Sequence, residues 1–355
     1  MRGVEVRNLV KAFGAVRAVD GVSFTVPPGG ITTMLGPSGC GKTTILRCIA
    51  GLETATDGEI VIGDRVVFSG GMSRVPVEQR NLGMVFQSYA IWPHMSIAAN
   101  VAYGLKVRRR PKAEIEKRVK DALALVRLSG FEQRLPGQLS GGQMQRVVLA
   151  RAIAYDPEIL LLDEPLANLD AHLREEMRQE LKRIQRETGT TMIAVTHDQS
   201  EALAISDQIL VMASGKILQR GSPQEIWRQP AVAGVAGFLG GVNRLPAVPR
   251  DGRLMVEGVG PLPAGAPTMA AAAQVIFRPT DARLLAPGEG EGEGWPGTVS
   301  LTQFLGQHIQ YLVHCGGHEL TIEVPASGRL FSEGETVTIA VDARALMIYP
   351  EPVAA

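Results

Sequence analysis

Residues 31–52 read ITTMLGPSGCGKTTILRCIAGL, and this stretch decides the fold. Its first five residues are mostly apolar or β-branched, which favours a buried strand, and its last part has the pattern of a helix. Between them, GPSGCGKT at 36–43 fits G-x-x-x-x-G-K-[ST]. The glycines let the backbone curl round a phosphate group, and the helix N-terminus adds a partial positive charge. The stretch therefore predicts an α/β domain with a phosphate-binding loop.

The side chains of this loop indicate a nucleoside triphosphate with its metal ion. Lys42 offers a point charge for the β- and γ-phosphates, and Thr43 offers a hydroxyl for Mg²⁺. We therefore expect ATP and Mg²⁺ as ligands. The residues expected to contact the nucleotide here are Gly36, Pro37, Ser38, Gly39, Cys40, Gly41, Lys42, Thr43 and Thr44.

A second segment, ILLLDEP at 159–165, supplies acidic groups. Its apolar residues predict a buried strand, and Asp163 and Glu164 stand at the carboxyl end of that strand, where parallel sheets bind ligands. We expect Asp163 to hold Mg²⁺ through water and Glu164 to act as general base toward the attacking water, an effect typically worth about 10²–10⁴-fold.

A third segment, LSGGQMQR at 139–146, predicts a helix start with Ser140 as N-cap. The two glycines that follow leave its end open to close approach, so it is a second candidate anion site. A single nucleotide bound at the loop would leave this second anion site unused, which suggests that the site serves another nucleotide.

These segments, in this order, resemble the ATP-binding cassette (ABC) ATPases, over residues 1 to about 240. Gln87 matches the glutamine that touches Mg²⁺ and water, LANLD at 166–170 matches the family's D-loop, and His197 matches the histidine at the γ-phosphate. Phe13 matches the aromatic residue that stacks on adenine. The resemblance implies an α/β P-loop NTPase with a helical subdomain at about 88–136.

The resemblance also implies a head-to-tail homodimer. In the family, the segment Ser140, Gly141, Gly142 and Gln143 of one copy closes over the phosphate loop of the other, with ATP between them. This would explain the second anion site. The sequence departs from the family's common pattern at Ala167 and Met144, and neither position carries a catalytic group.

Periodicity gives the organisation of the rest of the chain. In the first part it predicts a largely parallel sheet with strands at 4–9, 31–35, 82–86, 159–162, 191–196 and 208–212, and helices at 112–128 and 171–187. After about residue 240 the chain becomes rich in Pro and Gly, and GEGEGEG at 288–294 predicts an acidic loop. Short alternating runs then predict a small β-domain with strands at 274–277, 297–301, 309–313, 319–324 and 336–341. We place two domains at 1–240 and 241–355.

The sequence of the second domain indicates which kind of ABC protein this chain resembles. VIFRPTDARLL at 275–285 resembles the TOBE domain, an OB-like β module of certain bacterial importer ATPases, with Thr280 in place of the usual Glu. FQSYAIWPHMSIAANVAYGL at 86–105 and FLGGVN at 238–243 resemble importers of ferric iron, polyamines and related small solutes. The expected partners are membrane permease subunits and, through them, a solute-binding protein. A sugar importer is the alternative within this class.

Composition limits the other function classes. Lys+Arg and Asp+Glu number 36 each, so the charge gives no reason to expect a nucleic-acid partner. The chain shows no signal peptide and no run near the ~20 apolar residues that cross a bilayer. We therefore expect a peripheral protein that a permease holds at the cytoplasmic face of the inner membrane. A non-transport ABC ATPase of the DNA-repair or translation type stays open, and LSGGQ and His197 argue against a phosphotransferase.

Overall fold

The computed structural model describes residues 2–289 and 294–351, which form two compact units divided between Arg228 and Gln229. The division lies twelve positions before the predicted boundary at 240. Helix α8 (Ala233–Phe238) accounts for the difference, because it packs against strand β15 (Ala273–Phe277) of the second unit. Most of the predicted acidic loop at 288–294 lies outside the described residues.

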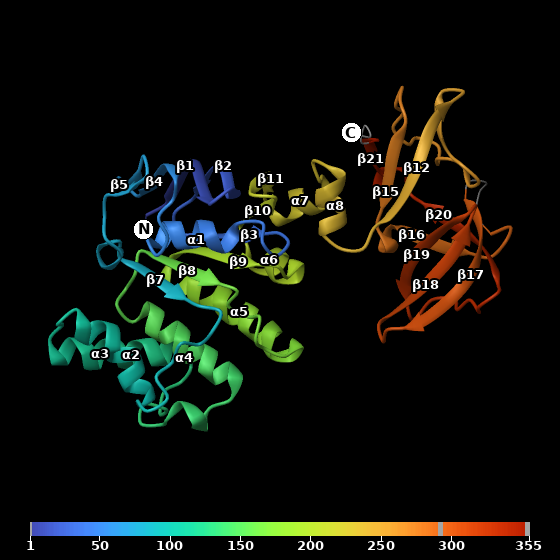
Figure 1. The fold of residues 1–355 in the computed structure, drawn as a ribbon. Coiled ribbons are helices and arrows are strands. Elements are labelled where there is room, and N and C mark those ends of the chain that lie inside the picture. The colour runs from blue at the N-terminus through green and yellow to red at the C-terminus, as the bar shows by residue number, and fades with distance from the viewer. Residues whose placement is uncertain (1, 290–293, 352–355) are drawn as a thin grey trace. The chain divides into compact units, whose positions relative to one another are not determined.

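The first unit is built on a six-stranded sheet of order β11-β10-β3-β9-β8-β7 (Figure 1). Its strands β10, β3, β9, β8 and β7 are mutually parallel, and β11 pairs antiparallel with β10 at one edge. The predicted strands at 31–35 and 191–196 are confirmed to the residue. The strands are β3 (Ile31–Leu35), β7 (Leu82–Val85), β8 (Ile159–Asp163), β9 (Thr191–Thr196), β10 (Gln208–Ala213) and β11 (Lys216–Gly221).

The strand predicted at 4–9 does not join this parallel sheet, so that part of the prediction is wrong. It is part of β1, which lies in a separate antiparallel sheet of order β2-β1-β4-β5-β6. The reason is local: β1 and β2 are joined by a tight turn, which permits only antiparallel pairing. The strands are β1 (Val4–Phe13), β2 (Val16–Val26), β4 (Asp57–Ile62), β5 (Arg65–Ser69) and β6 (Met72–Ser73).

Helices fill both faces of the parallel sheet. Helix α1 (Lys42–Ala50) lies between the two sheets, where Ile45, Leu46 and Ile49 are fully buried in a core shared with both (Figure 1). On the opposite face, α4 (Gly141–Ile153) and α5 (Ala171–Thr188) contribute to a second core. Two shorter helices, α6 (Gln199–Ile205) and α7 (Pro223–Arg228), follow β9 and β11. This layering places the carboxyl ends of β3, β8 and β9 beside the start of α1.

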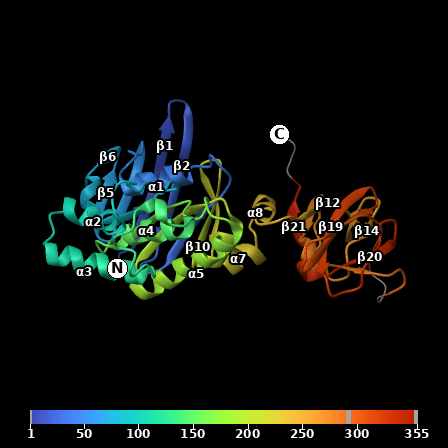
Figure 2. The same cartoon turned by 90° about the horizontal axis from the view of Figure 1, so that it is seen from below.

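A group of helices stands beyond the β7 edge, as Figures 1 and 2 show. It consists of α2 (Ile97–Val107), α3 (Lys112–Leu125) and α4, which pack on one another. The helical group therefore continues past the predicted range 88–136 to the end of α4. Buried Asn100 anchors it by donating to the carbonyls of Trp92, Met95 and Ser96 at 3.1 Å and accepting from Trp92 N at 2.9 Å.

The second unit is all-β apart from α8 and short 3₁₀ turns, which confirms the predicted small β-domain. Two five-stranded sheets, β14-β13-β12-β15-β21 and β16-β20-β17-β18-β19, share one core in which Phe277 and Tyr311 are fully buried. The remaining strands are β12 (Asn243–Arg250), β13 (Arg253–Val256), β14 (Gly260–Pro261), β16 (Ala282–Leu285), β17 (Trp295–Phe304), β18 (His308–Cys315), β19 (His318–Pro325), β20 (Thr336–Val341) and β21 (Met347–Pro350). In the described part of the chain, no helix is both long and apolar enough to span a membrane.

Candidate active site

The loop at 36–43 connects β3 to α1 and is shaped by its own lysine. Lys42 is buried, and its Nζ donates to the carbonyl oxygens of Gly36 at 2.7 Å and Pro37 at 2.9 Å. These bonds fold the loop over the lysine and hold the ammonium group at the centre of the turn. A buried ammonium group beside a helix N-terminus gives this loop the positive charge that attracts an anion.

Two glycines of the loop are required by close contacts. A Cβ on Gly36 would lie 2.3 Å from the carbonyl oxygen of Met212, and a Cβ on Gly41 would lie 2.3 Å from the carbonyl oxygen of Ala18. Gly41 also has a φ of 101°, a region that side chains disfavour. Ala18 lies on β2, so the antiparallel sheet presses directly against the loop. Cys40 points inward, since its side chain is buried and its Sγ lies 3.6 Å from Lys42 Nζ.

Thr43 and Asp163 meet at the adjoining strand end. Thr43 Oγ1 donates to Asp163 Oδ1 at 3.0 Å, and Arg47 lies 3.8 Å from the other carboxylate oxygen. Burial raises the pKa of Asp163, against the hydrogen bond from Thr43 and the charge of Arg47. A hydroxyl and a carboxylate oxygen side by side form a hard-oxygen pair of the kind that Mg²⁺ prefers.

The Glu164 carboxylate contacts two more of the predicted site residues, Gln87 and His197. Gln87 Nε2 donates to Glu164 Oε2 at 3.0 Å, and His197 Nδ1 lies 3.2 Å from Glu164 Oε1. Gln87 follows β7, Glu164 follows β8 and His197 follows β9, and these three strands are neighbours in the sheet. Parallel strands present their carboxyl ends at one edge, which is why residues so far apart in sequence converge.

Two residues for which the sequence predicted no individual role hold Gln87 and its neighbours in place. Asn168 Nδ2 donates to the backbone carbonyl of Gln87 at 2.8 Å and so joins the turn after Glu164 to the turn after β7. Arg151, on α4, donates from Nη2 to the carbonyl of Tyr89 at 3.1 Å. Asn168 lies inside the LANLD motif, which was the available signal. Arg151 carries no motif signal.

Residues 140–143 begin α4 as predicted but stand apart from the loop. Ser140 is the N-cap, accepting from Gln143 N at 3.4 Å, and Gln143 Oε1 accepts from Ser140 N at 3.1 Å. Gly142 is needed within the chain, because a Cβ there would lie 2.4 Å from Leu173 Cδ1, whereas Gly141 has ordinary room. Between the described residues of this segment and the loop at 36–43, no hydrogen bond or ion pair forms.

Phe13 closes β1, beside the turn into β2, and its side chain is 49% exposed. Lys11 Nζ lies 4.5 Å from the centre of the ring, a cation–π contact on one side. Phe13 is thus an exposed aromatic ring on the hairpin whose Ala18 lies close to Gly41.

Two family models match the chain: ABC transporter at residues 19–167 and TOBE domain at residues 275–348. Among curated relatives, the Fe(3+) ions import ATP-binding protein FbpC 1 of Pectobacterium atrosepticum is 42% identical over 349 residues, 98% of this chain and 97% of the relative. FbpC of Escherichia coli K12 is 45% identical over 91% of each chain. The sulfate/thiosulfate import ATP-binding protein CysA of Xanthomonas campestris is 41% identical over 98% of this chain and 99% of the relative.

Solved structures agree with the first unit. A dimeric, post-hydrolysis ATP-binding cassette bound to ADP and Pi is 31% identical, with a TM-score of 0.54 over 62% of this chain and 98% of that chain. cbiO1 of Clostridium perfringens, part of the ABC transporter complex cbiONQ, is 28% identical with a TM-score of 0.59 over 64% of this chain and 90% of that chain. The relatives match the chain almost end to end, which separates it from phosphotransferases and from non-transport ATPases. The chain belongs to the ABC transporter family, as an ATP-hydrolysing import ATP-binding subunit with a C-terminal TOBE domain.

Proposed function

We propose that Glu164 is the general base of ATP hydrolysis, with Gln87 and His197 beside it. The observation that carries this proposal is the convergence of both side chains on the two oxygens of one carboxylate, at 3.0 and 3.2 Å. Gln87 orients the attacking water, and His197 contacts the γ-phosphate that Lys42 and the loop bind. Phe13 stacks on adenine.

Mg²⁺ would be held by Thr43 and, through water, by Asp163, with Gln87 as a further oxygen ligand. The 3.0 Å contact between Thr43 and Asp163 fits this ion, because it places two hard oxygen ligands together. Among the described residues, no group of three His, Cys, Asp or Glu side chains could hold a metal ion. When bound, the ion neutralises developing phosphate charge.

The active unit is a head-to-tail homodimer in which Ser140, Gly141, Gly142 and Gln143 of one copy cover the ATP of the other. The capped but otherwise open start of α4 supports this arrangement, since Gly141 has room for a ligand to approach. A similar cassette has been solved as a dimer with ADP and Pi.

The transported solute is ferric iron, and the dimer works at the cytoplasmic face of the inner membrane, held by permease subunits that receive iron from a solute-binding protein. The names of the relatives at 42% and 45% identity support iron. A sulfate importer at 41% identity is the second candidate, while sugars and polyamines have no such support among these relatives. Uptake of ⁵⁵Fe(III) by cells with and without the gene tests this cargo, and ³⁵S-sulfate uptake in the same cells tests the second.

The permease contact lies on the segment after Gln87, where Tyr89, Ile91, Trp92 and Met95 are half-buried. Trp92 packs on Tyr103 with ring centres 4.2 Å apart, and Tyr103 is 41% exposed. Trp92→Ala tests this contact: we expect the ATPase rate of the isolated dimer to survive and permease binding to weaken. Unchanged permease binding would assign these side chains to local packing.

Two measurements test the catalytic proposal. Glu164→Gln is expected to retain ATP binding and to lose about 10²–10⁴-fold in turnover. The wild-type rate per chain is expected to rise with protein concentration, because a monomer lacks residues 140–143 of its partner. Full turnover by Glu164→Gln would show that Glu164 is not the general base. A rate per chain that does not depend on protein concentration would rule out the shared site, and the proposal of ATP binding would stand.

A further inference from the structure

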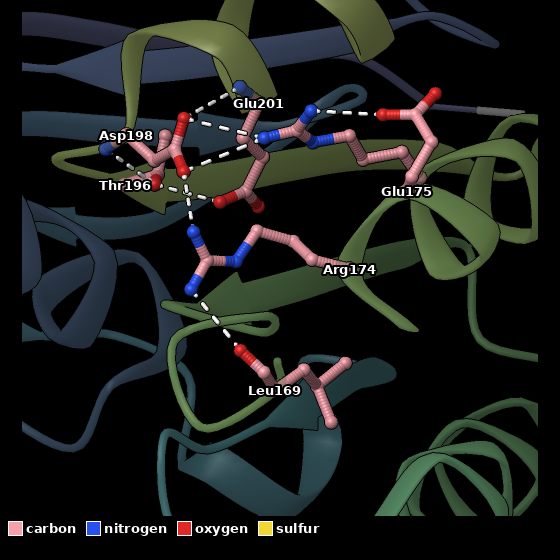
Figure 3. A network of polar contacts seen from close by, with 7 residues as sticks. Leu169, Arg174, Glu175, Thr196, Asp198 and Glu201 are labelled. Carbon is pink, nitrogen blue, oxygen red and sulfur yellow. Dashed lines mark hydrogen bonds and ion pairs between the residues drawn. The ribbon is translucent and has the colours of Figure 1, made fainter. Parts of the chain in front are cut away.

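Arg174 bridges two turns that flank the candidate catalytic residues. It lies in the first turns of α5, and its Nη2 donates to the backbone carbonyl of Leu169 at 3.1 Å. Its Nη1 donates to Asp198 Oδ2 at 3.1 Å. Figure 3 shows the guanidinium group between these two partners. One planar group thus joins the turn after β8 to the turn after β9.

Both ends of this bridge lie close in sequence to the catalytic group. Asp198 directly follows His197, and Leu169 belongs to the turn that begins at Glu164. The turn itself is tight, with Ala167 N donating to the Glu164 carbonyl at 3.3 Å. A shift of the bridge would therefore move the backbone on both sides of the 3.2 Å contact between His197 and Glu164.

The Asp198 end of the bridge is held rigidly. The carboxylate caps α6 by accepting from Glu201 N at 2.9 Å, and Asp198 N donates to Thr196 Oγ1 at 3.0 Å. Arg178 Nη2 lies 3.4 Å from both carboxylate oxygens. The turn at 164–170 is also held by its own bonds, from Glu164 N to the carbonyl of Val195 at 2.9 Å and from Leu169 N to that of Leu166 at 3.3 Å. Arg174 adds the link from the Leu169 end of this turn to Asp198.

We infer that Arg174 is a positioning residue for hydrolysis: its bridge from Leu169 to Asp198 holds Glu164 and His197 at their working distance. This inference rests on the proposed roles of Glu164 and His197. Arg174 itself contacts neither residue, and it lies outside the groups expected to touch ATP. Its loss should therefore slow turnover and leave nucleotide affinity unchanged. A misplacement of about 1 Å is enough to cost up to about 100-fold in rate.

The test compares three variants of α5 as purified full-length dimers. Arg174→Met keeps the aliphatic stem and removes both hydrogen bonds. Arg174→Lys keeps the charge beside Asp198 but loses the planar fork that serves two partners at once. Arg186→Met is the matched control, since Arg186 is an exposed arginine further along the same helix. For each we would measure kcat, KM for ATP, ATP affinity and the unfolding temperature.

We expect kcat of Arg174→Met to fall by about 10- to 100-fold with KM and ATP affinity within twofold of wild type. Arg174→Lys should recover part of this loss, and Arg186→Met should match wild type. Asp198→Asn keeps a capping side chain, and its combination with Arg174→Met should cost no more than the larger single effect. Additive losses, or equal rates for Arg174→Met and Arg186→Met, would overturn the inference.

Glu164→Gln in the same assay separates this inference from the proposed function. If Glu164→Gln loses turnover while Arg174→Met does not, the general base stands and the positioning role falls. If Glu164→Gln turns over normally, the proposed function falls, and the inference falls with it.

Discussion

Glu164 N donates to the backbone carbonyl of Val195 at 2.9 Å, and this bond fixes Glu164 at a φ of 48°. A left-handed conformation costs a residue with a Cβ about 1–2 kcal/mol. The bond to β9 therefore holds the carboxylate at the strand end in a strained backbone. Strain of this kind concentrates at functional positions, where the required direction of a side chain outweighs its conformational preference.

The strain predicts that two inactive variants of Glu164 differ in stability. Glu164→Gly relieves the left-handed strain, whereas Glu164→Ala removes the same carboxylate and keeps a Cβ. We expect both variants to lose hydrolysis and the glycine variant to be more stable than the alanine variant by about 1 kcal/mol. Calorimetric unfolding of the two proteins without nucleotide measures the difference. An alanine variant as stable as the glycine variant would show that the backbone is relaxed at this position.

The close approach of β2 to the phosphate loop predicts that Gly41 tolerates no side chain. In Gly41→Ala the new Cβ would lie 2.3 Å from the carbonyl oxygen of Ala18, which is backbone and cannot turn away. We expect loss of ATP binding, measured by nucleotide titration, and destabilisation beyond the ~1–2 kcal/mol of left-handed strain. Gly130→Ala is the control, because Gly130 has a φ of 87° and open space around it. Gly130→Ala should be destabilised only by the left-handed strain and should bind ATP as wild type does.

Much of the nucleotide site could be predicted from sequence because its parts are contiguous. The strand, loop and helix at 31–52 follow one another without interruption, so periodicity and glycine placement locate them together. The carboxyl ends of β8 and β9 could be predicted as well, since acidic and polar residues end fully apolar runs. Their convergence on Glu164 follows from parallel pairing alone.

The antiparallel sheet could not be predicted in this way. Strand β2 reads VRAVDGVSFTV, where Arg, Asp and Gly interrupt the alternation, and β1 carries bulges against both neighbours. Such strands depend on pairing partners that a local pattern does not reveal. The bridge by Arg174 was missed for a related reason: an arginine on a charged helix face has no local signal that distinguishes it from a solvated one.

Gly141 and Gly142 are adjacent in sequence but differ in their surroundings. We therefore predict that alanine at Gly142 lowers stability and that alanine at Gly141 lowers turnover. A Cβ on Gly142 would lie 2.4 Å from Leu173 Cδ1, between α4 and α5. We expect Gly142→Ala to lower the unfolding temperature, and Leu173→Ala to restore part of that loss in the double variant by freeing space. Gly141→Ala should unfold as wild type does and lose turnover, because the proposed dimer brings the partner's ATP to that position. If Gly141→Ala keeps its full rate, α4 does not approach a nucleotide there.

Glu201 predicts a pH dependence of stability. Burial raises the pKa of Glu201 to about 7, opposed by the hydrogen bond from Thr196, so the folded chain holds a proton that the unfolded chain releases near pH 4.5. Because the folded state binds more protons between these values, stability falls as pH rises from about 4.5 to about 7.

The size of this effect is of order 1–3 kcal/mol, since each pKa unit corresponds to 1.36 kcal/mol. Glu201→Gln cannot ionise and still offers an amide oxygen to Thr196, so its unfolding free energy should vary less between pH 5 and pH 8 than that of wild type. Urea unfolding at several pH values measures the two slopes. Glu116→Gln, which changes an exposed carboxylate on α3, should keep the wild-type slope. If the unfolding free energies of wild type and Glu201→Gln changed in parallel with pH, Glu201 would be charged in the folded protein. The positive charges of Arg174 and Arg178, on the adjoining helix, would then outweigh the effect of burial on the pKa of Glu201.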